Sequence, residues 1–242
     1  MSTVVHVDSA SFTYTIRHGG ATTLKDAAMN SIRRIANDVK VNALSDVSFT
    51  IEAGEVLAII GRNGAGKSTL LKLLAKTLPP SSGVVRIKGD IAPMIELGAG
   101  FNPELTGAEN IVLFGVLLGN STKTMKSKVA EIAEWAGLED HIHLPIRTYS
   151  TGMVARLGFA VATFRKSNLL IIDEVLSVGD ADFATKSKAR MMELIHSGES
   201  TVLVSHDLKT VAELATKVLW LDHGMQMALG SPSEVLDAYR SS

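Results

Sequence analysis

The chain has 242 residues, 46% hydrophobic and 20% charged, which is typical of a globular protein that buries a large core. Its formal net charge of −1 lacks the basic surplus of a nucleic-acid-binding surface, and the absence of cysteine excludes disulfides and thiolate metal sites. The first fifteen residues lack the pattern of a signal peptide, and no apolar run approaches about 18 residues. We therefore expect a cytoplasmic chain that needs a partner for any work at a membrane.

The N-terminal part combines a predicted strand with a segment that looks inserted. The stretch Phe12–Tyr14 and the valines before it indicate an opening strand, and Tyr14 is either a platform for a nucleotide base or an ordinary strand aromatic. Within residues 17–40, apolar side chains recur three or four positions apart from Leu24 to Val39, which predicts an amphipathic helix. Its basic residues fit contact with a membrane surface or an anionic partner, or the solvated face of a packed helix, which we favour.

The next segment holds the pattern around which the chain is organised. Val47–Ile51 alternates as a strand, and Val56–Ile60 is an apolar run typical of a strand buried on both faces. Gly61–Thr69 then reads G-R-N-G-A-G-K-S-T, and leucines at helical spacing follow it. This context of strand, glycine-rich loop and helix predicts a phosphate-binding loop, and Val84–Ile87 follows as a further short strand.

Each type of residue in the loop has a physical role in binding phosphate. Gly61, Gly64 and Gly66 allow the backbone to curl so that its N–H groups point inward, toward the same anion as the positive end of the helix. Lys67 is expected to reach the β- and γ-phosphates of a nucleotide such as ATP, and Ser68 to bind Mg²⁺. The other loop residues expected at the nucleotide are Arg62, Asn63, Ala65 and Thr69.

In residues 91–165 helical patterns replace the strand patterns of the preceding part, which predicts an α-helical insert in an α/β domain. A glycine-rich loop at 98–110 leads into helical patterns at about 107–118, 124–136 and 151–164. Strand–helix alternation returns in the last part of the chain, with two apolar runs suited to central parallel strands and then a hairpin and a short helix. These four elements are expected at Asn168–Ile172, Thr201–Val204, 218–229 and Ser233–Arg240.

Three side chains at predicted strand ends could support hydrolysis of a bound nucleotide. Asp173 and Glu174 follow an apolar strand, so Asp173 could hold Mg²⁺ and Glu174 could polarise the attacking water. His206 follows another strand and could donate to the γ-phosphate. Ser150 fits the N-cap of the helix that follows it, where Gly152 permits close approach of a second anion.

In this order, the motifs resemble those of the ATP-binding subunits of ABC transporters, over essentially the whole chain. Gly61–Thr69 is similar to the Walker A loop and Leu169–Asp173 to the Walker B strand, with Glu174 as the catalytic glutamate. Tyr149–Met153 resembles the signature motif. The D-loop, the switch histidine and the A-loop aromatic are matched by Ser177–Asp180, His206 and Tyr14.

The resemblance implies one nucleotide-binding domain over residues 1–242, an α/β P-loop NTPase of RecA-like type. Residues 1–90 and 166–242 would form the core with an antiparallel β-subdomain, and residues 91–165 an α-helical subdomain. Two such chains would face head to tail as a homodimer, with each ATP between one phosphate loop and the other chain's Ser150 and Gly152. Closure of the dimer would move a membrane-spanning permease.

Two departures from the family pattern are visible. The usual signature L-S-G-G-Q is Y-S-T-G-M here, although Ser150 and Gly152 remain. The family's Q-loop glutamine, which contacts metal and water, is missing, because the single glutamine of the chain is Gln226. Glu96 lies nearest the expected place and could contact the metal instead.

The stretch 96–110, the sequence S-T-G-M at 150–153 and the insertion before Val41 resemble those of the ATPases of bacterial polysaccharide exporters, which move lipid-linked O-antigen, capsule, teichoic acid and cell-wall galactan chains. This implies a lipid-linked substrate of O-antigen or galactan type, carried by the permease, and a peripheral location on the cytoplasmic face of the inner membrane. Residues 96–110 would form the transmission surface toward the permease. Because the chain ends at Ser242, we expect no separate glycan-binding domain.

Three alternative functions can be weighed from the sequence. An ABC ATPase acting on nucleic acid or ribosomes is disfavoured by the single cassette, the lack of a heptad array and the net charge. A P-loop kinase would not explain Tyr149–Met153, Glu174 and His206 together. An importer ATPase is disfavoured by the sequence at 96–110. We therefore expect an exporter ATPase and no nucleic-acid partner.

Overall fold

The computed structural model describes the chain except for residues 1, 18–37, 95–97, 99, 165–166 and 174–179. Its strands are β1 (Thr3–Arg17), β2 (Asp38–Glu52), β3 (Val56–Ile60), β4 (Ser82–Ile87), β5 (Ile91–Met94), β6 (Leu169–Ile172), β7 (Ser200–Val204), β8 (Lys217–Asp222) and β9 (Met225–Gly230). They form one mixed sheet in the order β4-β1-β2-β9-β8-β3-β7-β6-β5.

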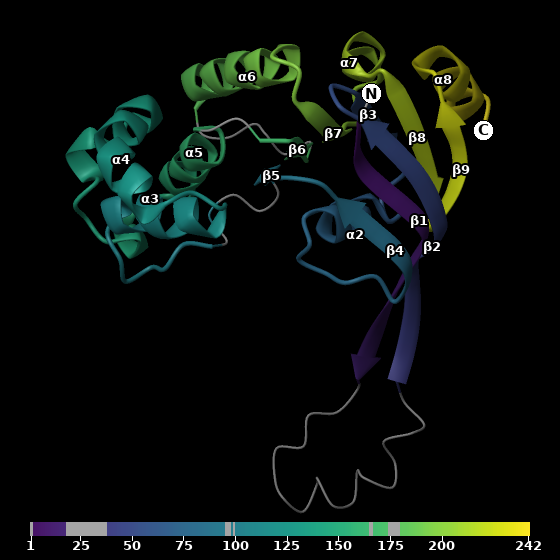
Figure 1. The fold of residues 1–242 in the computed structure, drawn as a ribbon, viewed down its shortest axis with the longest axis horizontal. Helices are drawn as coiled ribbons and strands as arrows, with labels where there is room; N and C mark the ends of the chain where they lie inside the picture. Colours follow the sequence, from purple (N-terminus) through teal and green to yellow (C-terminus); the bar gives the residue numbers. More distant parts are fainter. Residues whose placement is uncertain (1, 18–37, 95–97, 99, 165–166, 174–179) are drawn as a thin grey trace, which may run out of the picture.

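The helices of the structure are α2 (Lys67–Leu74), α3 (Gly107–Leu117), α4 (Thr122–Ala136), α5 (Thr151–Ala162), α6 (Ala181–His196), α7 (Leu208–Leu214) and α8 (Pro232–Arg240). Figure 1 shows α3, α4 and α5 grouped on one side, away from the strands β1, β2, β8 and β9.

The central strands β3, β5, β6, β7 and β8 run parallel, as the apolar runs predict. Every residue of β3, β6 and β7 is buried, which suits the continuous apolar sequence of β3 and β6. The two runs predicted as central strands are therefore confirmed. Because β3, β7 and β6 are neighbours, their carboxyl ends lie along the same edge of the sheet.

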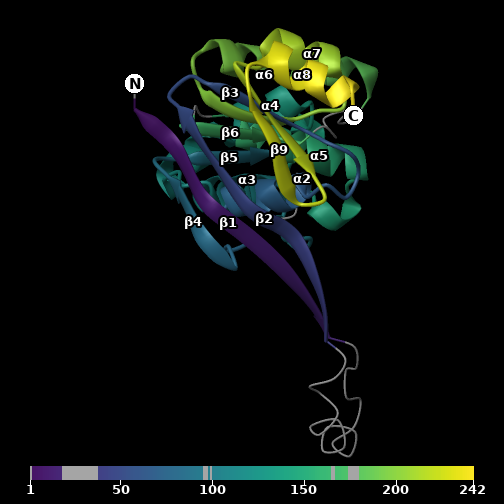
Figure 2. The same ribbon diagram turned by 90° about the vertical axis from the view of Figure 1, so that its right-hand side faces the viewer.

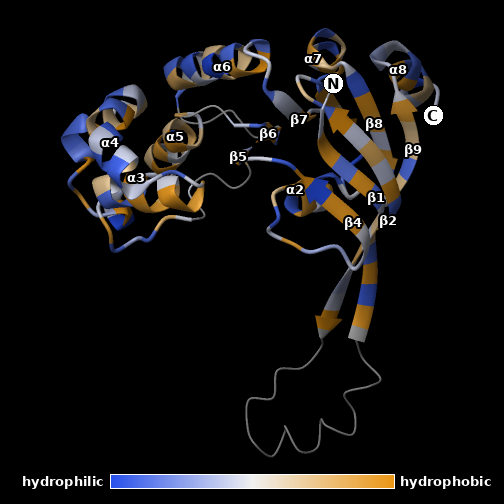
Figure 3. Ribbon diagram, in the orientation of Figure 1, coloured by the Kyte–Doolittle hydropathy of each residue, from blue (hydrophilic) through white to orange (hydrophobic). Residues whose placement is uncertain are grey.

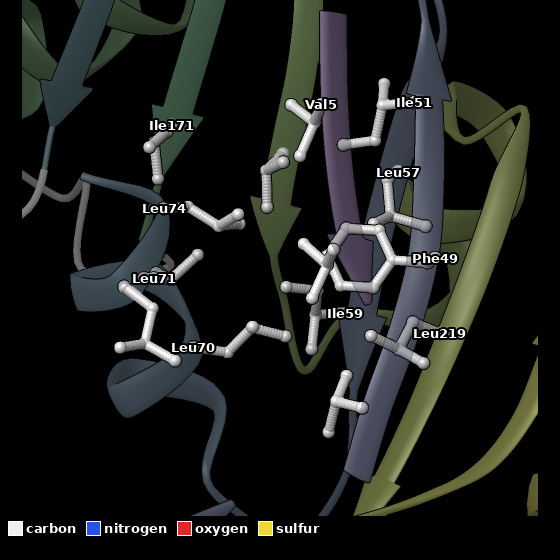
Figure 4. Packing of buried hydrophobic residues seen from close by; sticks show 14 of the residues in the cluster. Val5, Phe49, Ile51, Leu57, Ile59, Leu70, Leu71, Leu74, Ile171 and Leu219 are labelled. Carbon is white, nitrogen blue, oxygen red and sulfur yellow. The ribbon is translucent and has the colours of Figure 1, made fainter. Parts of the chain in front are cut away.

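Helix α2 packs its leucines against the strands to form the main core. Figure 4 shows Leu70, Leu71 and Leu74 pointing toward side chains of the sheet such as Leu57 and Phe49. All three leucines are fully buried. This packing fixes the start of α2, and with it the loop that precedes the helix, against the sheet. Helices α4 and α6 instead mix hydrophilic and hydrophobic residues along their length, as helices with one buried face do (Figure 3).

The strands β1, β2 and β4 form the expected antiparallel subdomain. The paired ends of β1 and β2 project from the body as a long hairpin (Figures 1 and 2). The predicted helix over 17–40 is wrong at its C-terminal end, because Val39 and Lys40 lie in β2, opposite Ile16 and Thr15. β-Branched residues on both strands favour this pairing. The remainder of that predicted helix lies outside the described residues.

The helical part has its own core, and its three predicted helices are present as α3, α4 and α5. Two short 3₁₀ helices, η1 (Glu139–His141) and η2 (Ile146–Thr148), connect α4 to α5. The proposed boundary at residue 91 needs correction, because β5 pairs with β6 as the last strand of the sheet and the helices follow it. The C-terminal hairpin and helix are confirmed as β8, β9 and α8. None of the helices in the described ranges combines the length and hydropathy that a membrane span needs.

Candidate functional site: a nucleotide cavity at the phosphate loop

The turn between β3 and α2 has the backbone shape that a phosphate-binding loop requires. Gly61, Gly64 and Gly66 have φ angles of 145°, 82° and 101°, in a region that side chains rarely tolerate. At Gly66, a Cβ atom would also lie 2.5 Å from the carbonyl oxygen of Ala43. Since Gly66 caps α2 without a side chain, it leaves the first N–H groups of that helix open to an anion.

Lys67 begins α2 and folds its side chain back over the loop. Its Nζ donates hydrogen bonds to the carbonyl oxygens of Gly61 at 2.6 Å and Arg62 at 3.0 Å. The side chain is almost buried, whereas the next residue, Ser68, is exposed. The loop therefore holds a positive charge beside its N–H groups and presents a hydroxyl next to that charge.

A cavity of about 620 Å³ opens beside the loop, a size typical of small-ligand sites. The loop contributes Asn63–Thr69, and the hairpin contributes Tyr14 and Val41–Ala43. Asp173, which follows β6, and His206, which follows β7, complete the group of chemistry-bearing residues. Parts of the chain that are far apart in sequence thus meet at one site because β3, β6 and β7 are neighbours in the sheet.

Tyr14 lies at this cavity on β1, and the residue is 38% exposed. Its hydroxyl lies 3.5 Å from Thr69 Oγ1, and its ring makes an edge contact with Phe12 at 4.8 Å between centroids. Val41 lies directly opposite in the hairpin and also lines the cavity. The sequence analysis missed Val41, although pairing with Tyr14 in a hairpin would have been the signal for it.

Replacing Tyr14 by alanine is expected to weaken nucleotide binding about tenfold, because stacking of a base on an aromatic ring contributes about 1–3 kcal/mol. Phenylalanine keeps the ring and loses only the long hydroxyl contact, so Tyr14→Phe should bind within about twofold of the unaltered chain. Titration with a fluorescent ATP analogue measures both. Equal losses in the two variants would assign the effect to the hydroxyl and contradict stacking.

Ser68 and Asp173 have the chemistry of a Mg²⁺ site. Both line the cavity, and they supply a hydroxyl and a carboxylate oxygen, which are the hard ligands that Mg²⁺ prefers. Mg²⁺ is usually held by one or two such protein groups together with the phosphates of the substrate. The described residues therefore fit the metal that the sequence pattern predicts.

Asp207, next to His206, has a different role. Its carboxylate accepts hydrogen bonds from the hydroxyl of Thr210 at 2.7 Å and from the N–H of Lys209 at 3.0 Å. These bonds, the Thr210 bond first, hold the pKa of Asp207 below its ordinary value. Asp207 is thus an ionised N-cap of α7 that fixes the turn carrying His206.

Ser150 and Gly152 lie at the start of α5 and are absent from the described lining of the cavity. The hydroxyl of Ser150 accepts a hydrogen bond from the N–H of Met153 at 3.2 Å, which is the N-cap expected from the sequence. Before it, Tyr149 donates to the carbonyl oxygen of His141 at 2.7 Å, and burial raises the pKa of the Tyr149 hydroxyl. The tyrosine that replaces the usual leucine therefore ties the start of α5 to η1.

Several predicted site residues lie elsewhere. Gly61 and Arg62 shape the loop and bind Lys67 through their carbonyl groups, without lining the cavity. Glu174, Glu96 and most of the segment that resembles a D-loop lie outside the described residues. Gln226 is on β9, where its Oε1 accepts from the N–H of Ser48, so it does not belong to this site.

Comparison with known proteins agrees with this geometry. A family model described as ABC transporter matches residues 44–177. The chain is 38% identical over 244 residues to the O-antigen export system ATP-binding protein RfbB of Klebsiella pneumoniae, covering 100% of this chain and 99% of that one. It is 43% identical over 231 residues to a protein of the same name from Myxococcus xanthus, covering 94% of this chain but only 53% of the relative. It is also 42% identical to the teichoic acids export ATP-binding protein TagH of Lactococcus lactis, covering 81% of this chain and 42% of that one.

Solved structures share the fold. An ATP-binding subunit of an ABC transporter superposes with a TM-score of 0.73 at 24% identity, covering 98% of this chain and 93% of that one. A dimeric ATP-binding cassette bound to ADP and Pi superposes with a TM-score of 0.71 at 20% identity, covering 94% and 98%. Fold, cavity and sequence similarity agree, and the chain belongs to the ABC transporter family of ATPases.

Proposed function

We propose that the chain is the ATP-binding and ATP-hydrolysing subunit of an ABC exporter that moves a lipid-linked polysaccharide, of O-antigen or galactan type, across the cytoplasmic membrane. The observation that carries the proposal is the match over the full length of both chains to an O-antigen export ATP-binding protein. The cavity supports it, because it joins the phosphate loop to Asp173 and His206. The chain would work at the cytoplasmic face of the membrane.

In this proposal the residues of the cavity divide the work of hydrolysis. Tyr14 stacks on the base, and Lys67 with the loop N–H groups of Asn63–Thr69 binds the phosphates. Ser68 and Asp173 hold Mg²⁺, with Glu96 as a further candidate; when bound, the metal neutralises charge on the phosphates. Together, these residues would hold the γ-phosphate in the position that the reaction requires.

Two further groups act on the reaction itself. Glu174, directly after Asp173, accepts the proton of the attacking water. His206 donates a hydrogen bond to the γ-phosphate from the end of β7. Since β6 and β7 are adjacent and parallel, residues that follow them approach the phosphate loop from one side.

A homodimer completes the site. The start of α5 is absent from the described lining of the chain's own cavity, and this supports assigning Ser150 and Gly152 to a nucleotide bound by another copy. A dimeric neighbour of the same fold supports this arrangement. In a head-to-tail dimer, the N-terminus of α5 would face the partner's ATP, and one chain alone would hydrolyse it poorly.

The loop before α3 is the proposed contact with the permease. Glu104 is exposed and pairs with Arg147 at 3.1 Å, while Leu117, at the end of α3, is 66% exposed. Backbone hydrogen bonds from Arg147 to Pro103 and from Ile146 to Leu105 link this loop to the segment that leads to Ser150. A displacement of the loop would therefore reach the start of α5 through a short, hydrogen-bonded path.

The proposal predicts a chemical phenotype in the native host. Depletion of the chain, or replacement of Glu174 by glutamine, should cause one lipid-linked glycan to accumulate on the cytoplasmic side, because export stops while synthesis continues. Mass spectrometry of the lipid extract identifies the glycan. Glu131→Gln is the matched control, since this exposed residue of α4 pairs with Lys128 and is absent from the described lining of the nucleotide cavity. Unchanged lipid-linked glycans, despite confirmed loss of ATPase activity, would refute polysaccharide export.

A further inference from the structure

Arg156 lies on α5 beyond Ser150, and its guanidinium reaches the first turn of α6. Its Nη1 lies 3.7 Å from Oδ2 of Asp180, and its guanidinium carbon lies 5.8 Å from the centre of the Phe183 ring. The side chain is only 24% exposed. Its Nε is buried and has no hydrogen-bond partner in the described part of the chain. A buried donor left in this way costs free energy, so stability alone does not explain an arginine here.

The partner carboxylate also shapes the start of α6. Oδ1 of Asp180 accepts the N–H of Phe183 at 2.9 Å, which makes Asp180 the N-cap of the helix. Its Oδ2 faces Arg156. One carboxylate thus fixes the first turn of α6 and connects it to α5.

The ring beneath the guanidinium is fixed as well. Phe183 is buried and packs edge-on against Trp135 of α4 and Phe159 of α5, with centroids 5.4 Å and 6.0 Å apart. The planar guanidinium therefore has one preferred orientation, set by a rigid ring on one side and a capping carboxylate on the other.

We propose that Arg156 is a positioning residue that holds the start of α5 in register with the start of α6. The two helix starts then move as one unit when two chains close on ATP. Ser150 and Gly152 therefore reach the ATP bound by the other chain together with Asp180. This inference rests on the proposed function, since it assigns a task to the dimer. The ion pair is partly exposed, so it adds orientation and little stability.

A double-mutant cycle tests the coupling. Arg156→Gln removes the charge at similar length, and Asp180→Asn removes the charge but keeps an oxygen that can accept from Phe183. Each single variant should lower ATPase activity about tenfold, since small misplacements of a site are costly, and the double variant should fall no further. The affinity of each variant for a fluorescent ATP analogue should stay within about twofold, because the chain's own cavity is unchanged.

Two results would overturn the inference. Losses that multiply to about a hundredfold in the double variant would show that the two residues act independently. A fall in nucleotide affinity equal to the fall in rate would place Arg156 in nucleotide binding. If Arg156→Gln does not fold, Arg156→Met, which also removes the charge and keeps an apolar stem, replaces it in the same cycle. Arg240→Gln is the control arginine, because its pair with Asp237 is exposed on α8.

Ser150→Ala, assayed in parallel, separates this inference from the proposed function. Formation of an ATP-trapped dimer is followed by size-exclusion chromatography in the Glu174→Gln background. The ATPase rate is measured in the chain that keeps Glu174. If Ser150→Ala leaves both the dimer and this rate unchanged, the proposed dimer site is wrong, and the role assigned to Arg156 is wrong with it. If Ser150→Ala impairs both while Arg156→Gln impairs neither, only the inference about Arg156 is overturned.

Discussion

Replacing Lys67 by methionine should lower the rate of ATP hydrolysis by a factor of about 10²–10³ and should leave the fold intact. Lys67 is 8% exposed, and its ammonium donates to two carbonyl groups of the phosphate loop. In the proposed function, this ammonium would stabilise the negative charge that develops on the γ-phosphate during transfer to water. Methionine keeps the apolar stem and removes the charge, so the variant loses this stabilisation while the packing at the start of α2 remains.

The measurement is phosphate release at saturating ATP, together with the temperature of thermal unfolding. Lys72→Met is the matched control, because Lys72 lies on the same helix and is absent from the described cavity lining. It should keep the rate within about twofold. A Lys67→Met chain that retains more than about a tenth of the activity would contradict the assigned role. A parallel fall in unfolding temperature would instead attribute the loss to damage of the fold.

The site elements that were predictable from sequence are those fixed by local chemistry. Val56–Ile60 is apolar throughout, which is typical of a strand buried on both faces, and the glycines that follow need φ angles that other residues avoid. The same reasoning located Asp173 and His206, because each follows an apolar strand of the parallel sheet. The structure adds the strand order, which brings these residues to one cavity.

The wall formed by Val41–Ala43 could not be predicted in the same way. Val39 fits the helical spacing that begins at Leu24, yet it pairs with Ile16 across a hairpin. Local periodicity cannot show that pairing, because the partner strand lies on the other side of the intervening segment. The position of Val41 opposite Tyr14 depends on the register of the two strands.

The boundary of the helical part was misplaced for a different reason. β5 contains Pro93, and a proline lowers the expectation of a strand because it cannot donate to the ladder. In the structure β5 is the last strand of the sheet, where a missing donor is tolerated. Strand order is a tertiary property, so the sequence of Ile91–Met94 alone does not reveal it.

Replacing Asn110 by alanine should lower the free energy of unfolding by about 2–4 kcal/mol. Asn110 is fully buried at the start of α3, and its Oδ1 accepts the N–H of Asn102 at 2.7 Å. Its Nδ2 donates to three carbonyl oxygens of the loop before α3, those of Asn102, Leu105 and Thr106. Alanine removes all four bonds and leaves the N–H of Asn102 without this partner. The side chain thus holds the whole loop in shape.

Urea unfolding measures the cost, and Asn120→Ala is the matched control. Asn120 follows α3, and in the described part of the chain its Nδ2 makes one bond, to the carbonyl oxygen of Gly115 at 2.9 Å, so its loss should cost about 1 kcal/mol. Equal costs for the two variants would refute the role given to Asn110. The loop before α3 carries Glu104 and lies apart from the nucleotide cavity. Folded Asn110→Ala should therefore bind ATP with an affinity within about twofold of the unaltered chain. Cells that carry this variant should nevertheless accumulate the lipid-linked glycan, because its export is impaired. A loss of nucleotide affinity as the first effect would show that this loop serves the cavity and not the permease.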